Sequence, residues 1–226
     1  MPRNAYFREL DALKDEILLM ASMVTAALND AVEALKKRDL ATAQRLIEED
    51  RIINTKRYEL EDRCLTVIAT QQPMASDMRL LAAVLEISTE LERIGDYAKG
   101  IGRIIIYLGS EPPVKSLVDI PLMSEKALDM LRRSLDAFIN QDVAAARAIP
   151  LEDDEVDALY NKVHRDLLEI IRQDPSRLER ANYLLWAAHN LERAADRVTN
   201  ICERVIYMVT GELVEVDAER ALAGLS

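Results

Sequence analysis

The sequence contains little glycine and little proline, with six Gly and seven Pro among 226 residues. These two residues interrupt helices most strongly, so their scarcity favours long, uninterrupted helical segments. Aromatic side chains make up only 4% of the chain, which argues against a stacking platform for single-stranded nucleic acid. Ala, Leu, Glu and Arg are abundant instead, and this composition is typical of long helices.

The chain also lacks the features of secreted and membrane-spanning proteins. Its two cysteines, Cys64 and Cys202, are isolated, which predicts reduced thiols and a cytoplasmic location. No uninterrupted run of about 18 apolar residues is present, so no membrane span is expected. The N-terminal segment lacks the apolar stretch of a secretory signal. We expect any association with a membrane to go through partner proteins.

Positive charge is the third deficit, since the formal net charge is −11 and the isoelectric point is about 4.8. An acidic chain repels phosphate backbones, so direct binding of DNA or RNA is not expected. Half of the residues are hydrophobic, which is enough to bury a substantial core.

One phrase occurs twice in the sequence, 100 residues apart. Residues 91–107 read LERIGDYAKGIGRIIIY and residues 191–207 read LERAADRVTNICERVIY, with Leu, Glu, Arg, Asp, Ile, Ile and Tyr in identical places. The chain is therefore interpreted as two copies of one unit.

Apolar residues three to four apart dominate the first half of the chain and predict three helices. The first covers about 10–37, and Asp39 is the expected N-cap of the second, at about 40–70. Gln72-Pro73 ends the second helix, because the residue before a proline avoids the α region. Ser76 or Asp77 is expected to cap the third helix, which ends near Leu108.

The segment Gly109-Ser-Glu-Pro-Pro113 is the strongest break in the sequence, and the second half then repeats the plan. The three helices expected there cover about 121–140, 142–173 and 176–210. Asp142 caps the middle one, and Asp174-Pro175 ends it. Gly211 ends the last helix, and the tail to Ser226 is expected to be loose or to add a short helix.

This pattern predicts an all-α protein of two tandem three-helix bundles related by an internal repeat. The expected repeats are residues 1–112 and 113–226. Helices of about 30 residues span about 45 Å, so an elongated molecule is expected. A solenoid of 30–40-residue repeats is the rival, but the repeat here is about 100 residues long.

Each repeated phrase contains a carboxylate pair four residues apart, Glu92/Asp96 and Glu192/Asp196. That spacing places both side chains on one helix face, where like charges repel by a few tenths of a kcal/mol. The second helix of each repeat carries polar residues at the same spacing, Asp50/Asn54 and Asp153/Asp157. The second and third helices are antiparallel, so the start of one and the end of the other meet, and the two pairs are predicted to converge.

Converging carboxylates in a helical bundle favour a divalent or trivalent metal ion, such as Fe, Mn, Mg, Zn or Ca. Asn54 lowers the charge of the first cluster, so the second is expected to bind more tightly. His189 shares a face with Glu192 and is a further candidate ligand, although the role of a partly exposed polar residue is favoured.

Two other interpretations stay open. In the first, the acids form an ordinary solvated face. In the second, the protein is a carboxylate-bridged metal enzyme, an oxidase or a hydrolase. Ferritin-like oxidases use Glu with Glu-x-x-His pairs, and neither His164 nor His189 lies in such a pair. The sequence leaves the oligomeric state open, and four apolar residues are candidates for a dimer seam: Met20, Met23, Leu122 and Met123.

Three phrases, IEEDRIIN, ATQQPMASDMRLL and LERIGDYAKGI, resemble the pattern of the PhoU family of bacterial phosphate-signalling regulators. The resemblance covers about residues 5–210. It implies that the family's metal motif maps onto Glu92/Asp96 and Glu192/Asp196, with Asp50 and Asp153/Asp157 as the partner motif and Asn54 as a departure from it.

The resemblance further implies a regulatory rather than catalytic role. PhoU-like proteins are cytoplasmic, often dimeric, and act at the membrane face through other proteins. The resemblance thus implies a homodimer that lies peripherally at the inner face of the membrane. They couple the ATPase subunit of the phosphate ABC transporter to a sensor histidine kinase. A negative regulator of phosphate uptake and of the phosphate-starvation response is therefore expected.

Overall fold

The computed structural model of the chain describes residues 3–216, and within that range every regular element is helical. The first repeat contains α1 (Arg3–Lys37), α2 (Leu40–Gln71) and α3 (Ala75–Leu108). The second contains α4 (Asp119–Asn140), α5 (Val143–Ala148), α6 (Asp153–Gln173) and α7 (Leu178–Thr210), with single 3-10 turns at Ile149–Glu152 and Pro175–Arg177. The all-α, two-bundle prediction is confirmed. The tail expected beyond residue 216 lies outside the described residues.

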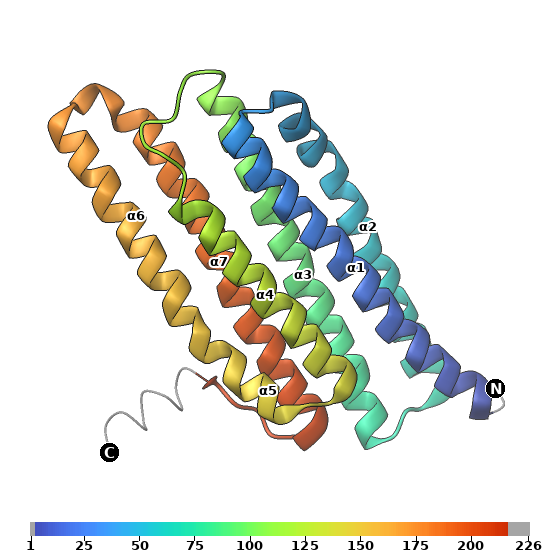
Figure 1. Ribbon diagram of the computed structural model, residues 1–226. Helices are drawn as coiled ribbons and strands as arrows, with labels where there is room; N and C mark the ends of the chain where they lie inside the picture. Colours follow the sequence, from blue (N-terminus) through green and yellow to red (C-terminus); the bar gives the residue numbers. More distant parts are fainter. Residues whose placement is uncertain (1–2, 217–226) are drawn as a thin grey trace, which may run out of the picture.

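The two bundles lie side by side with their long helices roughly parallel or antiparallel (Figure 1). Helices α3 and α7 pack against each other at the centre, α1 contacts α4, and α2 and α6 lie at the outer edges. The expected division after residue 112 falls in the segment that joins α3 to α4. One continuous hydrophobic core runs through both repeats.

Most of the predicted helix ends are present. Asp39 caps α2 by accepting the N–H groups of Ala41 and Thr42, both at 3.1 Å, and Asp142 accepts the N–H of Ala145 at 3.0 Å. Gly211 ends α7 with a φ of +79°, which a residue without Cβ adopts at little cost.

The N-cap expected at Ser76 or Asp77 is wrong, because α3 begins at Ala75 and Met74 precedes it without a capping side chain. The carboxylate of Asp77 instead accepts a hydrogen bond from the Tyr6 hydroxyl at 2.8 Å. This residue therefore joins α3 to α1 rather than starting the helix.

The single helix expected over 142–173 is also wrong, since the chain breaks into α5, a 3-10 turn and α6. Pro150 lies in the turn. Its nitrogen donates no hydrogen bond and its ring clashes with the carbonyl four residues earlier, so an α-helix cannot run through it undistorted. The break places Asp153 at the first position of α6.

Helix α1 is long and apolar enough to cross a membrane on length and composition alone. Leu13, Ile17, Met20 and Val24 nevertheless have no exposed surface in the fold, so packing in the core accounts for the apolar residues on this face of α1. Met20 and Met123 are both fully buried. Their expected place in a dimer seam is wrong, because their side chains pack within the chain.

Close approach of α3 to its neighbours depends on small residues. A Cβ at Gly95 would lie 3.0 Å from Ile53 Cδ1, and one at Gly102 would lie 3.1 Å from the carbonyl oxygen of Ala43, both in α2. On the other side of α3, Gly100 faces Asn190 of α7. The contacts at Gly95 and Gly102 bring the second half of α3 close to the first half of α2.

Candidate functional site

The first carboxylate cluster forms between α2 and α3, as the sequence predicts, but a lysine lies at its centre. Asp50 is only 6% exposed, and its Oδ2 accepts hydrogen bonds from Lys99 Nζ at 2.8 Å and Asn54 Nδ2 at 2.9 Å. The same ammonium donates to Asp96 Oδ1 at 3.1 Å. The hydrogen bond to Asp50 raises the pKa of Lys99, so this side chain stays charged.

Glu92 completes this first cluster and lies half-buried on the same face of α3 as Asp96. Burial raises the pKa of its carboxyl, and the charge of Asp96 raises it further. Arg57 of α2 opposes that shift and also donates a hydrogen bond to Glu61 at 3.1 Å. Two basic side chains of the protein therefore lie among the acids of the first cluster.

The second cluster lies between α6 and α7. Burial raises the pKa of the Glu192 carboxyl, the charge of Asp196 raises it further, and Asp157 of α6 adds to the effect, so these three acids are neighbours. Asp153 lies one turn before Asp157. The first and second clusters are thus built from equivalent places in the two repeats.

His189 lies beside Glu192, one turn earlier in α7. Its Nδ1 lies 3.1 Å from Glu192 Oε2, yet that buried oxygen has no partner with hydrogen-bond geometry. The ring of Tyr160 lies 5.9 Å from the His189 ring, centroid to centroid. Arg193 approaches the cluster at its rim, 3.6 Å from Asp196.

Neither cluster has a complete set of metal ligands already in place. Among residues 3–216, no group of three or more His, Cys, Asp or Glu side chains is arranged to hold an ion as they stand. Metal binding by the candidate ligands stays a prediction.

Sequence reasoning missed Lys99 and Arg57, although the repeat contains a signal for both. Lys99 lies within the duplicated phrase, where the second copy has Thr199, and Arg57 lies where the second copy has Tyr160. A comparison of the two copies for charge, rather than for identity, would have found them.

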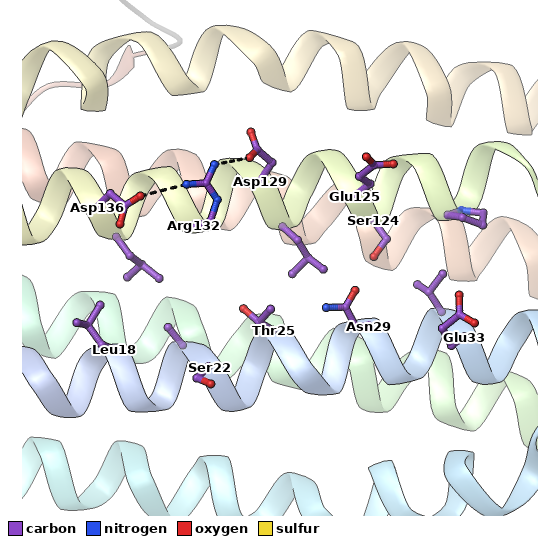
Figure 2. Close-up of a pocket in the computed structure, with 15 residues that line it drawn as sticks. Leu18, Ser22, Thr25, Asn29, Glu33, Ser124, Glu125, Asp129, Arg132 and Asp136 are labelled. Carbon is purple, nitrogen blue, oxygen red and sulfur yellow. Dashed lines mark hydrogen bonds and ion pairs between the residues drawn. The ribbon is translucent and has the colours of Figure 1, made fainter.

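A groove of about 540 Å³ separates α1 from α4 on another face of the molecule (Figure 2). Ser22, Thr25 and Asn29 of α1 line one wall. The α4 wall carries Arg132, which donates hydrogen bonds to Asp129 at 2.7 Å and to Asp136 at 3.2 Å. The groove runs along the junction of the two repeats and has a largely acidic rim.

Two segments of the chain, residues 17–105 and 120–205, match the family model of the PhoU domain. This chain belongs to the PhoU family. The first PhoU domain corresponds to α1–α3 and the second to α4–α7, so the resemblance found in the sequence is confirmed.

Named relatives cover nearly the whole chain. A PhoU homolog of Clostridium acetobutylicum is 35% identical over 96% of this chain and 100% of its own length. A PhoU homolog of Aquifex aeolicus is 37% identical over 92% of this chain and 95% of its own length. Both are named phosphate-specific transport system accessory proteins.

A solved structure gives the same result for the fold. The phosphate transport system regulatory protein PhoU from Streptococcus pneumoniae superposes with a TM-score of 0.87 at 28% identity, over 93% of this chain and 99% of that one. These names describe accessory and regulatory proteins, and they do not favour the metal-enzyme alternative.

Proposed function

We propose that this chain is a negative regulator of phosphate uptake and of the phosphate-starvation response. It acts by contact with two proteins, the ATPase subunit of the phosphate ABC transporter and the sensor histidine kinase of the phosphate two-component system. The observation that carries the proposal is the match of both repeats to the PhoU domain, together with relatives named as accessory proteins of phosphate-specific transport.

Regulation by contact, without catalysis, agrees with the chemistry of the side chains. Burial raises the pKa of both Cys64 and Cys202 to about 12, so both thiols stay protonated and unreactive near neutral pH. The acidic net charge of −11 is suited to docking on basic surfaces, because complementary charge guides encounter and selects partners. The proposed location is the cytoplasm, with the membrane reached only through the two partners.

A homodimer is part of the proposal. Of the four residues expected in the seam, Met23 is half-buried and Leu122 is 39% exposed, so these two are accessible to a second copy.

A metal ion is proposed at the second cluster, with Asp153, Asp157, Glu192 and Asp196 as ligands and His189 at its edge. The donor chemistry fits, because carboxylate oxygens and imidazole suit Mn, Fe and Zn. The buried Glu192 Oε2, which lacks a hydrogen bond, also fits such a role. The ion would neutralise the carboxylates and fix α6 against α7, which supports structure rather than chemistry.

Binding to the transporter tests the regulatory proposal. We expect the purified chain to bind the purified ATPase subunit of the phosphate transporter from the same organism, measured by biolayer interferometry. The ATPase subunit of an unrelated ABC importer is the control. Equal binding to the two subunits, or binding to neither, would contradict the proposal.

A further inference from the structure

The two carboxylate clusters differ most in positive charge. Alignment of the repeats pairs each basic or amide residue of the first cluster with a neutral or acidic one in the second: Lys99 with Thr199, Arg57 with Tyr160, and Asn54 with Asp157. The first cluster therefore has three carboxylates among two permanent cations, whereas the second has four carboxylates and neither cation. At these aligned positions the second cluster is therefore more negatively charged than the first.

Lys99 occupies the place where a bound cation would bridge α2 and α3. Its ammonium contacts Asp50 from α2 and Asp96 from α3, at 2.8 and 3.1 Å. The Lys99 side chain is only 21% exposed and that of Asp50 only 6%. A buried carboxylate needs a charged or hydrogen-bonding partner, and Lys99 together with Asn54 supplies it to Asp50.

We infer that the Lys99 ammonium is the resident cation of the first cluster, and that only the second cluster takes a metal ion. The second part rests on the metal ion included in the proposed function. An ion entering the first cluster would have to displace an ammonium that is covalently attached and already hydrogen-bonded. It would also leave that ammonium partly buried beside a second positive charge, which is unfavourable. Thr199 imposes no such barrier in the second cluster.

The first cluster thereby holds its shape whatever the supply of metal, while an ion bound to the second cluster is expected to stabilise it further. The two repeats of this chain are consequently expected to differ in sensitivity to metal. The seam between α6 and α7 is expected to loosen in a chelator, and the seam between α2 and α3 is expected to stay closed.

Bound Mn²⁺ per chain, measured by mass spectrometry of the metal after gel filtration, tests this inference in matched variants. The double variant Glu192→Gln/Asp196→Asn is expected to lose the bound Mn²⁺. The equivalent double variant in the first repeat, Glu92→Gln/Asp96→Asn, is expected to retain it. Loss of Mn²⁺ from the first-repeat variant would overturn the inference.

A swap of residues between repeats gives the positive test. The variant Asn54→Asp/Arg57→Tyr/Lys99→Thr gives the first cluster the residues of the second, and it is expected to bind one Mn²⁺ more than the wild type. Its melting temperature is expected to rise with Mn²⁺, because a ligand that binds only the folded state stabilises it. No gain of Mn²⁺ in this folded variant would overturn the role given to Lys99. Neither readout depends on binding to the transporter ATPase, so failure of the regulatory proposal would be seen separately.

Discussion

Replacing Glu90 with Ala is expected to lower the free energy of unfolding by about 3–5 kcal/mol, as for other buried ion pairs that lose one partner. Glu90 is 5% exposed and lies where α3 packs on α7. Its carboxylate accepts hydrogen bonds from Asn200 at 3.1 Å and Arg93 at 3.0 Å, and Arg197 lies 3.5 Å away. The Arg197 side chain is only 15% exposed, so removing Glu90 leaves a guanidinium buried without its counter-charge.

This contact joins the two repeats, so its loss is expected to weaken the α3–α7 interface as well as total stability. Urea unfolding followed by circular dichroism measures the effect. Glu33→Ala is the matched control, because Glu33 pairs with Lys36 and Lys37 on the surface and its loss is expected to leave the free energy of unfolding almost unchanged. The double variant Glu90→Leu/Arg197→Met is expected to regain most of the loss. If Glu90→Ala lowers the free energy of unfolding by less than about 1 kcal/mol, the pair contributes no more than an ordinary surface ion pair, and the prediction is contradicted.

Phe138→Ala is expected to lower the free energy of unfolding by about 3–5 kcal/mol, because removal of the ring leaves a cavity that the surrounding helices fill only partly. Phe138 lies in the last turn of α4 and is 1% exposed. For a chain of this size the loss corresponds to a fall in melting temperature of roughly 6–20 °C, measured by calorimetry.

The chain contains only one other phenylalanine, Phe7 in α1, and it provides the control. Phe7 is 44% exposed, so folding removes less of its surface from water. Phe7→Ala is therefore expected to lower the free energy of unfolding by about 1 kcal/mol or less. An equal fall in the free energy of unfolding in the two variants would show that α4 is not packed into the core at Phe138.

Local rules predicted most of the fold. The repeat, the composition and the 3–4 spacing indicated long helices, and Asp39, Asp142 and Gly211 marked their ends because capping depends on residues adjacent in sequence. The break at Pro150 was equally local but was overlooked within a strongly periodic segment. Asp77 could not be assigned in this way, because Tyr6 reaches it from 71 residues away.

The candidate site was predictable only in outline. Helix topology alone required the start of α2 to meet the end of α3, and Asp50 and Asp96 do meet there through Lys99. Which cation the acids contact depends on the reach of a flexible four-carbon side chain and on the close approach of α2 allowed by Gly95 and Gly102. That information lies in the packing of the helices and not in the spacing of charges along one helix.

Regulation of the phosphate response is tested most directly by a phosphate-starvation reporter in cells of the source organism. In phosphate-replete medium, deletion of the gene for this chain is expected to raise reporter expression towards the starved level. Re-expression of the chain is expected to restore repression. A reporter that stays repressed in the deletion strain would contradict the regulatory role proposed for this PhoU-family protein.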